Sequence, residues 1–209
     1  MRVAVLVLLI MATLAFLSCG PKPHVEAPGG DRVLWASQEP RPDWAYKEPF
    51  GEKGVQYFVG MSHKYADEKS SRDDAERDAR LGAVRYLETA ARESFERIDA
   101  ELGMASEVFN PSNAARGYAE WVSQAVIQNS KMVEFYSEQW ESAKTKEVYY
   151  ISFGKLMLPD DQVMESFRDY SNRKKQEWTM TQEQFDRVNE TFKEFWQSKK
   201  EEQKLKEEK

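Results

Sequence analysis

Cysteine and histidine are nearly missing from this 209-residue chain, which has one cysteine and two histidines. A disulfide within the chain is therefore excluded. His24 and His63 lack the neighbouring ligands that a histidine-based metal site needs. The sequence also contains no G-x-x-x-x-G-K-S/T or G-x-G-x-x-G phosphate loop and no G-x-S-x-G nucleophile elbow. We therefore expect no metal, no cofactor and no hydrolase triad, and we place His63 in a surface loop.

Positive charge is also in short supply. Lys and Arg number 30 against 36 Asp and Glu, which gives a formal net charge of −6. Proteins that bind nucleic acid carry a basic patch, so that class is not expected. The many acids leave a carboxylate-pair hydrolase as an alternative. However, Asp73-Asp74 and Asp160-Asp161 each stand at a predicted helix start, where acids balance the helix dipole. We expect a protein that is not an enzyme.

Long apolar runs are absent except at the N-terminus. Residues 3–17 form an uncharged, mostly apolar stretch that follows Arg2 and ends in small residues. That order is typical of a secretory signal peptide. A permanent membrane helix is the alternative, since the run is at the short edge of the roughly 17–25 residues that span a bilayer. The proline-rich segment that follows favours cleavage, and we predict a signal peptide over residues 1–18.

The single cysteine, Cys19, directly follows this run. The sequence Phe16-Leu17-Ser18-Cys19 resembles a bacterial lipoprotein signal, in which cleavage between Ser18 and Cys19 leaves an acylated cysteine as the first residue. Acylation would account for an odd cysteine in an exported protein, although a chance cysteine beside a plain cleavage site is the alternative. We expect the palmitate-type lipid on Cys19 to hold the protein in the bacterial cell envelope. Because Gly20 is not an aspartate, we expect the outer membrane, with the domain facing the periplasm.

The rest of the chain predicts an α+β fold, a small antiparallel sheet packed against a long helix. Residues 19–39, rich in proline and glycine, are predicted to be a flexible linker, and the domain is predicted over residues 40–158. Within it, residues 55–60 predict a central strand. Alanines at helical spacing predict a long helix over 71–102, with Ser71 and Asp74 as a weak capping box. The remaining predictions are a helix over 112–127 and a hairpin of strands over 132–140 and 148–157.

Several of these segments share a motif pattern with one known family. The pattern comprises Pro42 and Trp44, Tyr57-Phe58-Val59-Gly60, the stripe Ala75, Ala79 and Ala83, and the strands through Trp140 and Tyr149-Tyr150. It resembles the Lpp-twenty-type bacterial lipoprotein family over residues 40–158. Related domains occur in flagellar and cell-envelope lipoproteins. The resemblance implies a small antiparallel sheet packed on helices and no established enzymatic activity.

Residues 159–209 are predicted to be a helical extension with a charged tail, which is where the chain departs from that family. One helix should begin after Pro159, and a second should begin at Thr181, which forms a capping-box pair with Gln184. The second helix carries an apolar stripe that either docks on the domain or faces another protein. We predict it as the surface for an envelope protein partner. Its residues are Phe185, Val188, Phe192, Phe195 and Trp196.

Together these patterns predict a lipid-anchored envelope lipoprotein with a non-catalytic structural or protein-interaction role. The alternative is a periplasmic module that binds cell-wall glycan or a small ligand through exposed tryptophans, which a tryptophan-lined pocket would favour. Four of the six tryptophans are expected in the core and at its rim. These are Trp35, Trp44, Trp121 and Trp140.

Overall fold

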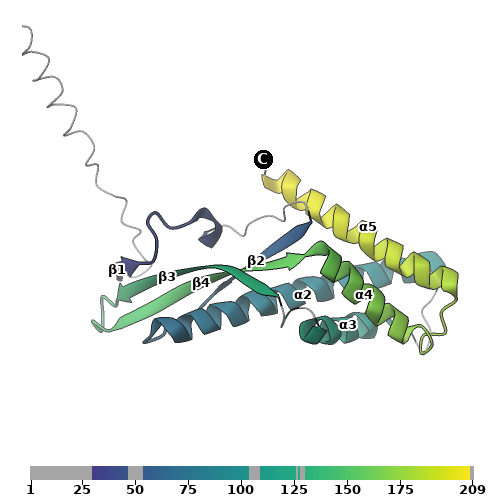
Figure 1. Cartoon of the computed structure of the whole chain (residues 1–209), viewed down its shortest axis with the longest axis horizontal. Coiled ribbons are helices and arrows are strands. Elements are labelled where there is room, and N and C mark those ends of the chain that lie inside the picture. Colours follow the sequence, from purple (N-terminus) through teal and green to yellow (C-terminus); the bar gives the residue numbers. More distant parts are fainter. Residues whose placement is uncertain (1–29, 47–53, 104–108, 126, 128–129, 208–209) are drawn as a thin grey trace, which may run out of the picture.

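The strands of this protein form one antiparallel sheet, seen in the computed structural model, which describes residues 30–46, 54–103, 109–125, 127 and 130–207. Within these residues, β1 (Arg32–Ala36), β3 (Lys131–Glu141), β4 (Val148–Pro159) and β2 (Val55–Met61) lie side by side in that order. Helices pack against the sheet and beyond its end (Figure 1). The predicted α+β class, with its long helix and C-terminal helices, is confirmed. Ser18 and Cys19 lie outside the described residues.

The prediction that residues 55–60 form a central strand is wrong, because β2 lies at an edge and pairs only with β4. Both sides of β2 are apolar for a different reason. Phe58 and Gly60 face the long helix and are buried, whereas Tyr57 and Val59 lie on the opposite face and are partly covered. An edge strand can therefore carry apolar residues on both faces when each face has a cover.

The predicted linker over residues 19–39 needs correction at its C-terminal end. Residues 32–36 form β1, which pairs with β3 from Arg32↔Glu141 to Ala36↔Glu138, with a bulge between Val33 and Trp35. The sequence prediction missed this strand because it is short and follows a proline- and glycine-rich segment. The domain thus begins before residue 40, and the segment after β1 leads to a 3-10 turn, η1 (Asp43–Ala45).

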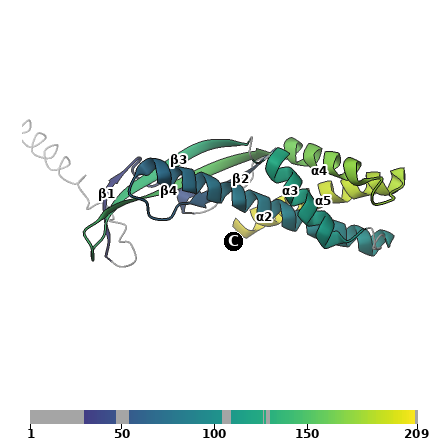
Figure 2. The same ribbon diagram turned by 90° about the horizontal axis from the view of Figure 1, so that it is seen from below.

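The long helix α2 (Glu68–Leu102) has 35 residues and therefore a length of about 52 Å. It begins at Asp67, whose side chain accepts the Ser70 N–H at 2.8 Å, and ends at Gly103, which has a left-handed φ of 61°. The predicted capping box is wrong: Ser71 instead bonds to Ser152 of β4. Seen from below, α2 runs along most of the molecule, with the sheet beside its first half and the other helices beside the rest (Figure 2).

Small residues allow α2 to lie directly on the sheet. Ala75, Ala79 and Ala83 are fully buried along one stripe of the helix, and Gly60 of β2 lies beneath them. A Cβ atom on Gly60 would fall well inside contact distance of the Ala75 carbonyl oxygen and the Ala79 nitrogen. The missing side chain therefore sets how closely helix and sheet approach.

Three more helices complete the core at the end of the molecule away from β1 (Figure 1). These are α3 (Pro111–Ala125), α4 (Asp160–Lys174) and α5 (Gln182–Glu207). The predicted restart at Thr181 is confirmed, because Thr181 N–H donates to Gln184 Oε1 at 3.0 Å and Gln184 N–H donates to Thr181 Oγ1 at 3.2 Å. Both α3 and α5 pack on α2, and α4 packs between them.

We expect Gly60→Ala to destabilise the fold by about 1–3 kcal/mol, because the new methyl group collides with the α2 backbone, which cannot move aside alone. Gly82→Ala is the matched control. Gly82 is exposed in the middle of α2 with open space around it, so alanine there should stabilise by up to about 1 kcal/mol. Urea denaturation of both variants measures the difference. Equal effects would contradict the proposed close contact.

Candidate functional site

The apolar stripe of α5 is not an exposed surface. Phe185, Val188, Phe192 and Trp196 are buried within the chain's own core, and Phe195 is partly buried against it. The prediction that these side chains form a partner surface is therefore wrong, and the alternative of docking on the domain is what the structure shows. The physical reason is that α2 is longer than the sheet, so its second half needs cover from other helices.

Aromatic stacking fixes α5 in this position. The Phe192 ring stacks on Phe167 of α4 with centroids 3.7 Å apart and an interplanar angle of 4°, and it meets Tyr118 of α3 edge-on. Trp196 meets Tyr86 of α2 edge-on at 5.6 Å. Residues from all four helices thus meet in one aromatic cluster, so the predicted extension belongs to the same core as the predicted domain.

Hydrogen bonds to Asp160 hold α5 in the same interface near the sheet. Trp196 Nε1 donates to Asp160 Oδ1 at 3.0 Å, and Lys200 Nζ donates to Asp160 Oδ2 at 2.6 Å. Lys200 also donates to the Val55 carbonyl oxygen at 3.1 Å. Asp160 therefore holds α5 to the start of α4 and to β2. Both its oxygens are engaged, which does not suit a catalytic acid paired with Asp161.

The two carboxylates of the other acidic pair, Asp73 and Asp74, also have different surroundings. Asp74 accepts the His63 N–H at 2.9 Å and lies 3.0 Å from His63 Nδ1 and 2.5 Å from an Arg77 nitrogen. The His63 backbone N–H and the Arg77 guanidinium hold the pKa of Asp74 well below its usual range. Asp73 contributes instead to a hollow beside α2. The two carboxylates therefore do not form an acid–base pair.

His63 lies in a surface loop, as predicted, with 91% of its side chain exposed. Its contact with Asp74 has the form of an acid–histidine pair, but the neighbouring hydroxyl is not positioned to act as a nucleophile. Ser62 Oγ is buried and donates to the His63 carbonyl oxygen at 2.8 Å. Among the described residues, no group of three or more His, Cys, Asp or Glu side chains could hold a metal ion.

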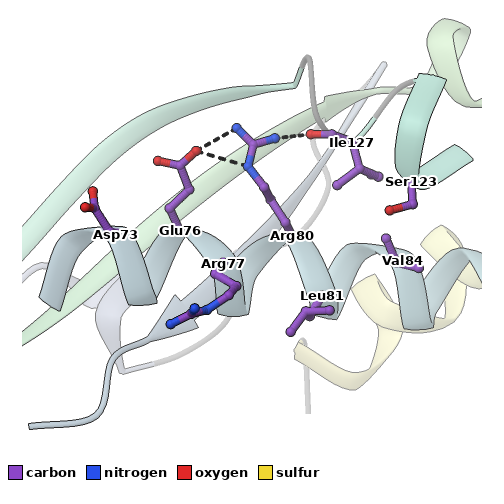
Figure 3. A pocket seen from close by; sticks show the side chains of 8 residues that line it. All are labelled: Asp73, Glu76, Arg77, Arg80, Leu81, Val84, Ser123 and Ile127. Atoms are coloured by element: carbon purple, nitrogen blue, oxygen red, sulfur yellow. Dashed lines mark hydrogen bonds and ion pairs between the residues drawn. The ribbon is translucent and has the colours of Figure 1, made fainter. Parts of the chain in front are cut away.

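A hollow of about 420 Å³ opens between α2 and the chain that follows α3. Figure 3 shows Arg80 reaching from α2 to the Ile127 carbonyl oxygen, with Glu76 beside it. Glu76 Oε1 accepts from Arg80 at 2.7 Å, so these charges satisfy each other rather than converge on a bound molecule. Neither this hollow nor a second one along the polar side of α5 is lined by tryptophan, the feature that would favour a glycan-binding module.

A buried ion pair lies on the face of the sheet opposite α2. Arg41 makes two hydrogen bonds to Glu138, at 2.8 and 2.5 Å, and Glu138 also accepts from the Tyr136 hydroxyl at 2.7 Å and from Trp140 Nε1 at 3.1 Å. Burial, with the Glu138 carboxylate as acceptor, raises the pKa of Tyr136. A buried pair is tolerated only when its remaining hydrogen bonds are made, as here. It fixes the segment after β1 onto the sheet and has a structural role.

Sequence reasoning missed this pair, although a signal was present. Tyr136, Glu138 and Trp140 alternate along β3 on one face, so a carboxylate stands where the pattern requires a buried side chain. A charged residue at such a position indicates a buried partner. The identity of that partner could not be read, because Arg41 is 97 residues away along the chain.

Asp31 forms a third polar cluster, at the end of the molecule where β3 turns into β4. Its carboxylate accepts from the Ala143 N–H at 3.0 Å, the Tyr149 hydroxyl at 2.6 Å and Lys64 Nζ at 3.1 Å. These hydrogen bonds, with that of Tyr149 the strongest, lower the pKa of Asp31 to about 2. The cluster fixes the point at which the described chain joins the sheet. No local sequence signal could reveal it, since two of the partners lie more than 100 residues away.

Among the described residues, no helix has the length and apolar character needed to cross a bilayer. No protein-family model matches the chain, and no curated protein or solved structure gives a significant match. The resemblance to Lpp-twenty-type lipoproteins thus rests on the motif residues themselves.

We expect Phe192→Ala to destabilise the protein by about 3–5 kcal/mol, because it leaves a cavity among the stacked rings of α3, α4 and α5. Lys193→Ala, at an exposed position of the same helix, should change the free energy of unfolding by less than about 0.5 kcal/mol. Chemical denaturation of both variants provides the measurement. A mild effect of Phe192→Ala would contradict the role of α5 in the core.

The contribution of Asp31 to stability should depend on pH. Its pKa falls from an ordinary 3.8 to about 2 on folding, so the stabilisation is complete above about pH 4 and disappears as the pH falls toward 2. The difference in free energy of unfolding between the wild type and Asp31→Asn should therefore shrink over that range. A difference that stays constant from neutral pH down to about pH 2 would contradict the assignment.

Proposed function

We propose that this chain is a lipid-anchored lipoprotein of the bacterial cell envelope, with a non-catalytic structural or protein-interaction role. The single observation that carries the proposal is Cys19, the only cysteine, at the end of an uncharged apolar run that follows Arg2. Two acyl chains on one cysteine hold a protein far more firmly than a single chain, whose binding is reversible. The anchor would therefore restrict the domain to the membrane surface.

The way in which the chain enters the domain supports a tether. Asp31 binds the β3–β4 turn, β1 pairs with β3, and Arg41 is locked to Glu138 on the outer face. The first described residues are thus held at three successive points. Such an attachment fixes the end of the domain that a membrane tether would reach, which a loosely joined terminus would not do.

The proposed non-catalytic role is supported by the polar clusters of the described residues. The carboxylates of Asp74, Glu138 and Asp160 each bind side chains or backbone groups of the protein itself. They hold loops, the N-terminal segment and α5 in place. These carboxylates therefore make an elongated protein rigid. Such rigidity suits a spacer or scaffold in the envelope.

The resemblance to Lpp-twenty-type lipoproteins supports the same proposal. The residues that carry it include Gly60 and the alanine stripe of α2, and these form the contact between helix and sheet. Related domains occur in flagellar and cell-envelope lipoproteins. The proposed location is the outer membrane, with the domain facing the periplasm. A protein partner would contact surfaces other than the buried stripe of α5.

Cys19→Ala should move the protein from the membrane fraction to the soluble fraction and abolish incorporation of labelled palmitate. Ser18→Ala is the matched control, since a small residue before the cysteine is kept, and it should leave both properties unchanged. Fractionation of cells that express each variant is the measurement. If Cys19→Ala still incorporated labelled palmitate, the proposed lipid anchor would be wrong.

A further inference from the structure

The face of the sheet that packs on α2 is left uncovered at one end. The first row that α2 covers is made by Ser137 and Ser152, whose hydroxyls lie 2.9 Å apart, with Ser71 of α2 2.6 Å from Ser152. Side chains alternate along strands, so the next two rows on the same face are Gln139↔Tyr150 and Glu141↔Val148. These rows lie nearer the β3–β4 turn, beyond the start of α2.

Strand β1 widens this uncovered face. Trp35 lies opposite Gln139, and Arg32 lies opposite Glu141. Trp35 and Val148 are each 44% exposed, and Leu34, at the bulge of β1, is 41% exposed. Half of the large exposed apolar side chains among the described residues therefore gather at this end of the sheet, which we call the turn end and define as residues 31–35, 64 and 139–150.

The charges of the turn end are arranged with the bases outermost. Arg32 and Lys146 form ion pairs with Glu141, and Lys64 forms one with Asp31; in each pair the base is much more exposed than the acid. The turn end has one more base than acids, although the whole chain has a net charge of −6. Its charged residues are Arg32, Lys64, Lys144 and Lys146 against Asp31, Glu141 and Glu147.

The N-terminal segment joins the domain at this same end. Asp31 bonds to the Ala143 N–H in the β3–β4 turn, so the chain toward Cys19 starts beside that turn. Ten residues lie between Cys19 and Gly30, and the eleven steps along the chain span at most about 40 Å even when fully extended. A lipid on Cys19 would therefore keep the turn end close to the bilayer surface.

We propose that the turn end rests on the phospholipid surface, with Leu34 and Trp35 among the headgroups and the surrounding lysines and arginines near the phosphates. This inference rests on the lipid anchor proposed above. Tryptophan prefers the interface between water and hydrocarbon, and long basic side chains extend their charge toward phosphate. The helical end, where α4 meets α5, then points away from the membrane (Figure 1).

A fluorescent label tests this orientation. The acylated mature protein, which begins at Cys19 and is reconstituted in vesicles of phosphatidylethanolamine and phosphatidylglycerol, has no free thiol unless one is introduced. An environment-sensitive dye on Glu147→Cys, in the turn, should emit at shorter wavelength and be quenched by nitroxide-labelled headgroups. The same dye on Gln176→Cys, exposed at the helical end, should show neither effect. Equal behaviour of the two positions would overturn the proposal.

A second pair of variants separates contact from mere tethering. Leu34→Ser with Trp35→Ser should remove the spectral shift and the quenching at position 147 while the protein still sediments with vesicles. If the quenching persisted, the tether alone would explain it and the proposal would be wrong. Because Trp35→Ser could affect folding, Lys144→Glu, at an exposed position without a structural contact to lose, should weaken the quenching in these anionic vesicles but not in phosphatidylcholine.

The lipid anchor is read out independently in the same experiment. Labelling of the parent chain, which lacks an introduced cysteine, would reveal an unmodified Cys19 and would overturn the anchor together with this inference. Suppose that the parent chain sediments with vesicles and is not labelled, and that the dye on Glu147→Cys is not quenched. That result would overturn the turn-end contact alone.

Discussion

The fold depends on how closely α2 can approach the sheet at Gly60. Because Gly60 has no side chain and the α2 residues above it are alanines, the helix backbone approaches β2 closely. A helix held this close at one end is fixed in direction, and α2 is far longer than the strands it crosses. Its second half therefore projects past the sheet with apolar residues on several sides, which α3, α4 and α5 must cover.

This constraint explains why the C-terminal helices are not an appendage. Phe167 packs on Phe95 in the second half of α2, and Trp196 packs on Tyr86, which also meets Phe58 of β2. Asp160 ties α5 back to β2 through Lys200. One hydrophobic core thus runs from the sheet into the helices. The polar clusters lie at its margins, where they join segments that are distant in the chain.

Local patterns predicted most of the elements, because helix and strand periodicity depend on near neighbours. The α2 alanine stripe, the β3–β4 hairpin and the capping box of Thr181 and Gln184 are of this kind. Strand β1 and the edge position of β2 depend on pairing with distant strands, and the burial of Phe192 depends on packing against α3 and α4. The polar clusters at Asp31 and Arg41 were missed for the same reason.

The direction of β1 has a mechanical consequence. This strand begins at the turn end and runs inward, antiparallel to β3, and its last residue leads to the segment that Arg41 locks to the sheet. A force drawn along the N-terminal chain away from the domain would act parallel to the strand. The hydrogen bonds between β1 and β3 would then share the load at once, instead of opening one after another. The attachment is therefore strongest in the direction in which a membrane tether would pull.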